Sequence, residues 1–229
     1  MIILDPTHPV FPDTSRALTN PPGLLAAGGN LQPDVLTDAY TRGIFPWYSE
    51  GEPILWWSPN PRAVLLPQDL HISRGSRRQL RKCSFHLTSN QCFETVLCAC
   101  AETRESTGTW INNEIIAAYL RLHELGIAQS VEVWEHKALV GGLYGIKLGN
   151  LFCGESMFHY KQNAAKFAFC QTAMHLFNHG YRMIDCQINN AFLDSLGVRD
   201  MPRDIFETAL AHSRTVNLPW PTAWPTISI

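Results

Sequence analysis

The sequence predicts an α+β fold, with a small N-terminal domain over residues 1–62 packed on a larger C-terminal domain over residues 63–229. Three observations lead to this prediction. Prolines punctuate the first 62 residues, the composition shifts after Arg62, and from Asn90 onward amphipathic helices alternate with strands. A chain of 229 residues can form one large domain together with a small one.

Composition and charge exclude several classes of protein. A net charge of −2 gives no global attraction to nucleic acid, so any such binding needs a local patch. No apolar run approaches the ~20 residues that span a bilayer, and the N-terminus lacks a signal-peptide pattern. The seven cysteines are odd in number and contain no C-x-x-C pair, which argues against a disulfide framework. We therefore expect a cytoplasmic monomer with no membrane partner.

In the first domain, the proline spacing predicts little regular structure before a short helix over Pro33–Arg42, which Gly43 ends. A cluster of aromatic residues follows. Trp56 and Trp57 favour packing, as buried aromatics usually do. Trp47 stands beside a proline and a polar loop, so packing and stacking on a base are both open for it.

One segment of the chain concentrates positive charge without an acidic neighbour. Its basic residues are Arg74, Arg77, Arg78, Arg81 and Lys82. The four arginines have the i, i+3, i+4, i+7 spacing of a single helical face. A solvated face is the common explanation of a charge run, but on a chain of net charge −2 we favour phosphate binding.

From Asn90 the pattern becomes regularly α/β. The expected helices and strands are, in order, the helix Gln91–Ala101, a helix capped by Asn112-Asn113 and running through Leu125, the strand Gln129–Trp134, a helix capped by Asn163 over Ala164–His179, and the strand Tyr181–Gln187. Thr103–Thr109 is expected to be a polar loop that can move. His175 and His179 have a zinc-chelating spacing but no third ligand, so we expect surface histidines. The tail after Leu218 is expected to be extended and to pack by its tryptophans.

A hairpin is expected at the centre of the second domain. Strands over Leu139–Leu148 and Leu151–Phe158 are joined by Gly149-Asn150, a dipeptide favoured in tight turns. The first strand contains Gly141, Gly142 and Gly145, which suggests a wall cleared for a ligand. Alternation along the second strand places Glu155 on one face with Cys153 and Met157. An edge hairpin with a solvated glutamate is the alternative, and we favour a ligand cleft.

The order of strand, hairpin, long helix and strand resembles that of acetyltransferase-type α+β folds, in which two strands splay to admit an acyl donor. Enzymes of that kind hold the pyrophosphate of coenzyme A with a glycine-rich loop. The matching stretch here, residues 159–164, contains no glycine. A coenzyme A pyrophosphate therefore lacks its usual binding loop.

Longer runs of residues resemble one family closely. They are GLLAAGGNL (23–31), GIFPWYSEGEPILWWSPNPRAVL (43–65), LHISR (70–74), LVGGLYG (139–145), FCGESMF (152–158) and IDCQ (184–187), and they are similar to those of leucyl/phenylalanyl-tRNA–protein transferase. The resemblance implies transfer of Leu or Phe, less well Met, from aminoacyl-tRNA to the α-amine of proteins beginning with Arg or Lys, which marks them for N-end rule degradation. It also implies an acetyltransferase-like C-terminal domain and no metal or soluble cofactor.

The resemblance also suggests roles for particular residues. Asp185 and Gln187 would be catalytic, with Gln187 orienting the attacking amine and Asp185 polarising or orienting Gln187. A buried structural role for Asp185 stays open. Glu155 would bind the acceptor's cationic end or the terminal ribose. The remaining substrate contacts would be Leu143, Met157 and Ile184 for the esterified side chain, Asn190 for the substrate, and Trp47 and Trp110 for the terminal adenosine. The basic segment would bind tRNA phosphates.

Two departures from the family pattern lie near these positions. His159-Tyr160 replaces a Ser-Arg pair expected beside the pocket, and Phe192 replaces a histidine. Two other functions stay open at this stage. An acyl-coenzyme A N-acetyltransferase would act without tRNA, and a non-enzymatic RNA-binding module would need the basic segment but not Glu155 or the Asp185–Gln187 pair.

Overall fold

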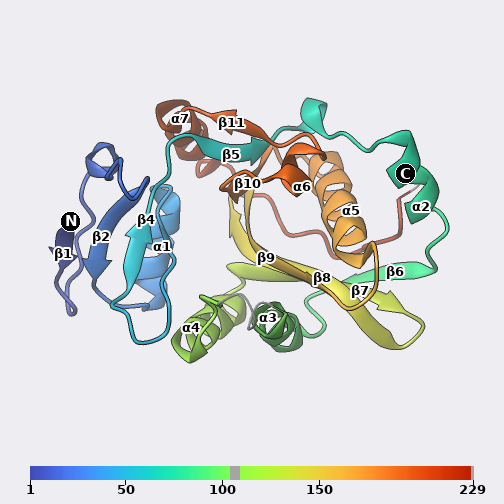
Figure 1. Cartoon of the computed structure of the whole chain (residues 1–229), viewed down its shortest axis with the longest axis horizontal. Coiled ribbons are helices and arrows are strands. Elements are labelled where there is room, and N and C mark those ends of the chain that lie inside the picture. The colour runs from blue at the N-terminus through green and yellow to red at the C-terminus, as the bar shows by residue number, and fades with distance from the viewer. Residues whose placement is uncertain (104–108, 228–229) are drawn as a thin grey trace.

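The computed structural model describes residues 1–103 and 109–227, which form two sheets with helices packed around them (Figure 1). The smaller sheet has the strand order β1-β2-β4-β3 and the larger one the order β11-β5-β10-β9-β8-β7-β6. The strands of the smaller sheet are β1 (Ile2–Leu4), β2 (Leu24–Gly28), β3 (Phe45–Pro46) and β4 (Leu55–Trp57). The strands of the larger sheet are β5 (Arg62–Leu65), β6 (Phe85–Ser89), β7 (Ala128–Glu135), β8 (Ala138–Leu148), β9 (Leu151–His159), β10 (Met183–Gln187) and β11 (Arg199–Met201).

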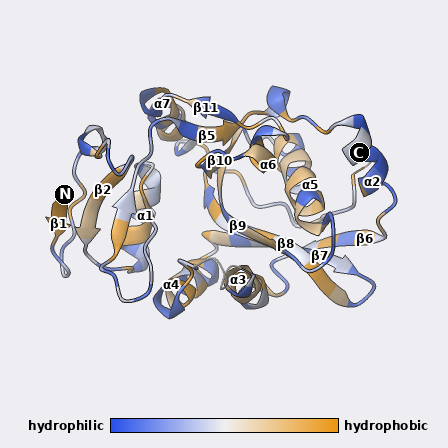
Figure 2. Cartoon of the chain, in the orientation of Figure 1, coloured by the Kyte–Doolittle hydropathy of each residue, from blue (hydrophilic) through white to orange (hydrophobic). Residues whose placement is uncertain are grey.

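The helices pack against both sheets. They are α1 (Pro33–Thr41), α2 (Arg74–Leu80), α3 (Phe93–Glu102), α4 (Asn113–Glu124), α5 (Ala164–Asn178), α6 (Ala191–Asp194) and α7 (Arg203–Ser213), with 3-10 turns at Thr14–Arg16 and Pro67–Asp69. α3 and α4 lie on one face and α5 on the other (Figure 1). Figure 2 shows that α5 is largely apolar, whereas α2 is hydrophilic. The α+β fold class, with a small unit beside a larger one, is confirmed.

The glycines of β8 serve close packing, so the prediction that they clear a wall for a ligand is wrong. A Cβ atom on Gly141 would lie 2.7 Å from the Cβ of Ala164 in α5. A Cβ on Gly145 would lie 2.1 Å from the carbonyl oxygen of Cys153 in β9. None of the three glycines lines the pocket described below. They allow α5 and β9 to approach the backbone of β8.

A bulge in β9 changes which side chains share a face. Gly145 pairs with Gly154 and Tyr144 with Ser156, so Glu155 is the extra residue. Beyond it the alternation reverses, and Met157 joins the apolar cluster that contains α5, opposite the cluster of Cys153. The prediction that Cys153, Glu155 and Met157 share one face is therefore wrong for Met157. Regular alternation could not anticipate an inserted residue.

β9 and β10 pair in parallel over three residues and then diverge. Met183–Asp185 pairs with Leu151–Cys153, and the pairing between β9 and β10 ends at Asp185. On its other edge β10 also carries a register shift between Asp185 and Gln187, where Gln187 has a φ of 64°. This positive φ turns the end of β10 away from the ladder. The opening between the two strands matches the splayed pair that the acetyltransferase-type order predicts.

Most predicted elements of the second domain are present to within two residues at their ends. Asn112 caps α4 by accepting from the backbone N–H of Ile115. Asn163 stands at the start of α5 with a φ of 71° and no capping hydrogen bond from its side chain, so its predicted capping role is wrong. The loop predicted over Thr103–Thr109 lies mostly outside the described residues.

The first domain contains more strand than its prolines suggest. β1 and β2 pair in parallel before α1, against the prediction of little regular structure there. The prediction fails because these strands lie between the prolines rather than across them. α1 is present as predicted, Trp56 is fully buried, and Trp57 is half-buried against Trp47 at a ring distance of 5.5 Å. Arg62 already belongs to β5, the first strand of the larger sheet, so the division at residue 62 stays a proposal.

The C-terminal tail packs along α5 and explains a buried histidine. His179 is exposed, but His175 is 2% exposed and its Nε2 lies 2.6 Å from the carbonyl oxygen of Pro225. The prediction of two surface histidines is therefore wrong for His175. Trp224 is buried, which confirms that the tail packs by a tryptophan. All seven cysteines are free thiols, and no helix among the described residues is long and apolar enough to cross a membrane.

Candidate active site

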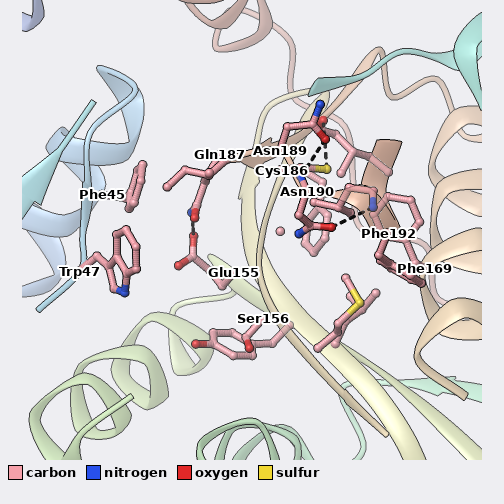
Figure 3. A pocket seen from close by; sticks show the side chains of 18 of the residues that line it. Phe45, Trp47, Glu155, Ser156, Phe169, Cys186, Gln187, Asn189, Asn190 and Phe192 are labelled. Atoms are coloured by element: carbon pink, nitrogen blue, oxygen red, sulfur yellow. Dashed lines mark hydrogen bonds between the residues drawn. The ribbon is translucent and has the colours of Figure 1, made fainter. Parts of the chain in front are cut away.

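A pocket of about 470 Å³ opens where β9 and β10 diverge (Figure 3). This volume lies in the range of small-molecule sites in proteins. Residues from the first domain and from both faces of the larger sheet line it. They are Phe45–Trp47, Trp110, Leu143, Tyr144, Phe152, Gly154–Met157, Phe169, Thr172, Ile184, Cys186–Asn190, Phe192 and Leu193. The first domain therefore contributes part of the pocket wall.

One end of the pocket is apolar. The three residues expected to hold a substrate side chain, Leu143, Met157 and Ile184, all line it. Phe169 of α5 and Phe192 lie beside one another at this end in Figure 3. Phe192 is thus a wall of the pocket, whereas the pocket lining does not include His159 or Tyr160. Tyr160 points to α3 instead, where its hydroxyl donates to Glu102 at 3.2 Å.

Two hydroxyl groups in the pocket wall lack a partner among the described residues. They belong to Ser156 of β9 and Thr172 of α5, which are 5% and 1% exposed. A buried polar group without a partner is rare in folded proteins, since it loses its hydrogen bonds to water. Nothing in the sequence pattern singled out either residue. The pocket wall therefore holds two buried hydroxyl oxygens whose hydrogen bonds the described residues do not satisfy.

At the other end of the pocket, Glu155 and Gln187 face each other across the splayed strands (Figure 3). The side-chain amide nitrogen of Gln187 donates to Glu155 Oε1 at 2.8 Å. The opposite carboxylate oxygen, Oε2, accepts from the hydroxyl of Tyr119 at 3.2 Å. Because the amide nitrogen of Gln187 faces the carboxylate, its amide oxygen points elsewhere and stays available as an acceptor.

Burial sets the ionisation of Glu155. The side chain is 9% exposed, and this desolvation raises the pKa of Glu155 from 4.5 to about 7. Hydrogen bonds from Tyr40, Cys153 and Tyr119 act in the opposite direction and lower the pKa. The charge of Asp185 raises it further. Glu155 is therefore a carboxyl group that exchanges a proton near neutral pH, as general acids and bases do.

Asp185 lies behind Gln187 and does not line the pocket. Its two oxygens accept from Arg62 Nε at 2.8 Å and Arg62 Nη2 at 2.7 Å, in a bidentate pair that is almost fully buried. Asp185 Oδ1 also accepts from the backbone N–H of Gln187 at 2.9 Å. That bond holds the backbone of Gln187 in its positive-φ conformation. Asp185 thus contacts the Gln187 backbone rather than its side-chain amide.

The other expected substrate residues lie at the pocket's rim. Trp47 is 41% exposed and Trp110 is half-buried, and both line the pocket. This exposure favours stacking over core packing for Trp47. Asn190 also lines the pocket, but its side-chain oxygen accepts from the backbone N–H of Leu193 and caps α6. Its amide nitrogen is the group left to contact a ligand.

The basic segment lies away from the pocket. α2 stands at the opposite end of the molecule from β1 and β2 (Figure 1). Arg74, Arg77, Arg78, Arg81 and Lys82 are all exposed. The helix ends at Leu80, with Arg81 still in a helical conformation at its C-cap, and Arg77 Nε donates to the carbonyl oxygen of Ile72. A ligand that contacts both the pocket and this segment must be large.

Sequence reasoning also missed three residues that lie behind Glu155 and Asp185. Arg62 forms the ion pair with Asp185. The only feature of the sequence that could have identified it is that a charged residue begins an apolar strand. Tyr40 and Tyr119 are buried beside Glu155, from α1 and α4. Their positions read as ordinary core positions of amphipathic helices, so no pattern marked them.

Comparisons with known proteins match this chain over most of its length. A family model described as leucyl/phenylalanyl-tRNA protein transferase matches residues 64–211, and the model of that family's N-terminal domain matches residues 29–60. The chain is 55% identical over 200 residues to the leucyl/phenylalanyl-tRNA–protein transferase of Pectobacterium atrosepticum, covering 87% of this chain and 85% of that one. It is 54% identical over 218 residues to the protein of the same name from Aromatoleum aromaticum, covering 95% and 92%.

Among solved structures, a GCN5-related N-acetyltransferase from Kribbella flavida matches with a TM-score of 0.38 and 9% identity, over 74% of this chain and 61% of that one. A similarity of that size carries no argument about function. The sequence matches do, because they cover most of the chain, including Glu155, Asp185 and Gln187 between the splayed strands. This chain belongs to the leucyl/phenylalanyl-tRNA–protein transferase family.

Proposed function

We propose that this protein is an aminoacyltransferase that moves Leu or Phe, and less well Met, from aminoacyl-tRNA to the N-terminal α-amine of proteins beginning with Arg or Lys. One observation carries the proposal: a single pocket joins an apolar end to the Glu155–Gln187 pair. The new N-terminus marks the acceptor for N-end rule degradation. Charged tRNA is a cytoplasmic substrate, so we place the protein there, acting as a monomer.

The reaction needs positioning more than activation, because an aminoacyl ester is already reactive. The neutral amine nitrogen attacks the ester carbonyl carbon, an amide bond forms, and the bond to the 3′-oxygen of the terminal ribose breaks. Gln187 has no useful basicity, so its amide oxygen orients the amine by accepting one N–H. Asp185, held by Arg62, acts as a positioning residue that fixes the backbone of Gln187.

Glu155 accepts the proton that the amine loses. An α-amine has a pKa of about 7.7–8.0, and the pKa of Glu155 is raised to about 7 by burial. The two groups therefore exchange a proton at low cost near neutral pH. The proton then goes to the departing 3′-oxygen, so the balance closes without another reactant. In its ionised form, Glu155 also attracts the cationic side chain of an acceptor that begins with Arg or Lys.

The apolar end selects the transferred residue. Leu143, Met157 and Ile184 enclose a side chain of the size of Leu or Phe. Met157 is flexible and adapts to branched and flat shapes. A smaller side chain such as Val or Ala loses one or two methylene contacts, worth about 1–3 kcal/mol. Trp47 and Trp110 enclose the terminal adenosine at the rim.

A transfer assay tests the proposal directly. The purified protein, mixed with labelled Phe-tRNA and a peptide beginning with Arg, should label the peptide, and a peptide beginning with Glu should stay unlabelled. Gln187→Ala should lower kcat in a variant that still folds. Full activity of a Gln187→Ala, Asp185→Ala variant would refute the assigned roles.

The same assay separates the alternative functions. Label from acetyl-coenzyme A on the peptide without tRNA would indicate an N-acetyltransferase. Binding of tRNA without any transfer would indicate a non-enzymatic RNA-binding module. The wild type should instead transfer from charged tRNA and show no acetyl transfer.

The basic segment around α2 contacts tRNA phosphates in this proposal. The test variant is Arg78→Glu with Lys82→Glu. Arg77 is left unchanged because its side chain already donates to a backbone carbonyl. The test variant should raise the KM for Phe-tRNA, leave kcat unchanged, and reduce the slope of log KM against log salt by about 2. Arg16→Glu with Arg182→Glu alters the charge equally at exposed positions elsewhere and serves as the control. Equal KM values for the two variants would argue against phosphate binding at α2.

A further inference from the structure

Two buried tyrosines reach Glu155 from the side opposite to Gln187. Tyr40 belongs to α1 in the first domain and Tyr119 to α4, and their exposed fractions are 2% and 0%. Their hydroxyl groups are hydrogen-bonded to one another. The Tyr119 hydroxyl also donates to Glu155 Oε2 at 3.2 Å. We refer to these two residues as the tyrosine pair.

The tyrosine pair and Gln187 hold the carboxylate from two directions. Gln187 occupies Oε1 at 2.8 Å, and the tyrosine pair lies at Oε2. A carboxyl group held at both oxygens cannot rotate freely. Its orientation fixes the plane of the Gln187 amide and so the direction of the Gln187 amide oxygen.

Both tyrosines are neutral donors under physiological conditions. Burial raises the pKa of each well above 10, and the nearby charge of Glu155 raises it further. A donated O–H stabilises the ionised carboxylate over the protonated one. The other groups that act on Glu155 are the Cys153 thiol on β9, the Asp185 carboxylate on β10, and Arg62 on β5.

We propose that Tyr40 and Tyr119 are positioning residues of the transfer reaction: they hold Glu155 in the orientation and ionised form in which it binds Gln187 and accepts the proton of the amine. The inference rests on the proposed function. It also assigns a role to the first domain, which supplies Tyr40 and so completes the catalytic site from outside the larger sheet.

Phenylalanine substitutions test this role, because they remove the hydroxyl and keep the ring. Tyr48→Phe is the matched control, since the buried Tyr48 also joins the first domain to α4 through a hydroxyl–carboxylate bond, to Glu114 at 3.1 Å. Initial rates with Phe-tRNA and an Arg-starting peptide are measured between pH 5.5 and 9 for each variant.

Tyr119→Phe and Tyr40→Phe should each lower kcat at pH 7 about tenfold with an unchanged KM for Phe-tRNA. Each should move the acidic limb of the kcat profile to higher pH, because the ionised carboxylate has lost a donor. Tyr48→Phe should leave the limb in place. Unchanged limbs in both variants of the pair, or an equal change in Tyr48→Phe, would overturn the proposal.

A second measurement does not depend on activity. Labelling glutamate with carbon-13 lets the side-chain carboxyl of Glu155 be titrated by NMR, with Glu155→Gln identifying its signal. The titration midpoint should rise in both variants of the tyrosine pair and stay in place in Tyr48→Phe. A wild-type protein without transfer activity would refute the proposed function. Midpoints that do not move would refute the role of the tyrosine pair.

Discussion

Glu155 and Asp185 are two buried carboxylates on neighbouring strands, and their surroundings differ in one respect. Asp185 forms a bidentate ion pair with Arg62. Glu155 accepts from Tyr119, Gln187 and Cys153, and forms no ion pair within residues 1–103 and 109–227. Both contact Gln187, Asp185 through its backbone and Glu155 through its side chain.

This difference in partners gives the two carboxylates different roles in the proposal: Asp185 is structural and Glu155 takes part in the chemistry. A guanidinium with two parallel hydrogen bonds holds the Asp185 carboxylate in one geometry. Glu155 is buried and its hydrogen-bond donors are neutral. Desolvation therefore raises its pKa to about 7, so that it gains and loses a proton near neutral pH. In the proposed mechanism, Asp185 therefore fixes the backbone of Gln187, and Glu155 exchanges the proton.

Breaking the ion pair should have the largest effect on stability. Arg62→Leu leaves the Asp185 carboxylate buried without its partner and should reduce the free energy of unfolding by about 3–5 kcal/mol. The double variant Arg62→Leu, Asp185→Leu removes both charges and should lose less than the single variant. Urea denaturation at pH 7 measures both values. A double variant less stable than Arg62→Leu would show that the charges themselves hold the two strands together.

Removing the charge of Glu155 should act in the opposite direction. Its pKa is about 7 in the folded protein against an ordinary 4.5, so the unfolded chain releases this proton first. Stability from Glu155 is therefore fully present below pH 4.5 and falls by up to about 3 kcal/mol as the pH rises through 7. Glu155→Gln should abolish this fall and be more stable than the wild type at pH 8.

The same variant should lose activity while it gains stability. Without a proton acceptor, kcat at pH 8 should drop about a hundredfold or more. Asp185→Asn provides the contrast, since it leaves Arg62 without a charge partner and should lose both stability and activity at that pH. Thermal unfolding and transfer rates at pH 5, 6, 7 and 8 compare the two. A Glu155→Gln variant that is destabilised at pH 8 would contradict the assigned proton exchange.

The comparison also explains what the sequence could predict. Periodicity identified α1, α3, α4, α5, β8, β9 and β10, because their apolar spacing follows from burial on one or two faces. The hairpin pattern directed attention to Glu155 and the resemblance to a family directed it to Asp185 and Gln187, and the structure brings all three together. The proposed roles of these residues await the measurements above.

Geometry that depends on single residues escaped prediction. The bulge at Glu155 and the positive φ of Gln187 break the alternation that sequence reasoning uses, and they direct both side chains toward each other. Arg62, Tyr40 and Tyr119 lie far along the chain from the residues they contact. Only the packing of α1, α4 and β5 around β9 and β10 brings them to the site, so no local pattern could reveal them.

The smallest expected effect concerns Cys153, whose thiol lies between the two carboxylates. Its Sγ is 3.5 Å from Glu155 Oε1 and 3.2 Å from Asp185 Oδ2. Cys153→Ser replaces a weak donor by a stronger one, which should lower the pKa of Glu155 and move the acidic limb of the kcat profile down by roughly half a pH unit. Cys170→Ser buries a hydroxyl in α5 and is the control, for which the limb should stay in place. If the acidic limb of Cys153→Ser instead moves to higher pH, the new hydroxyl donates to Asp185. Glu155 then loses the donor that the Cys153 thiol provides, and its pKa rises.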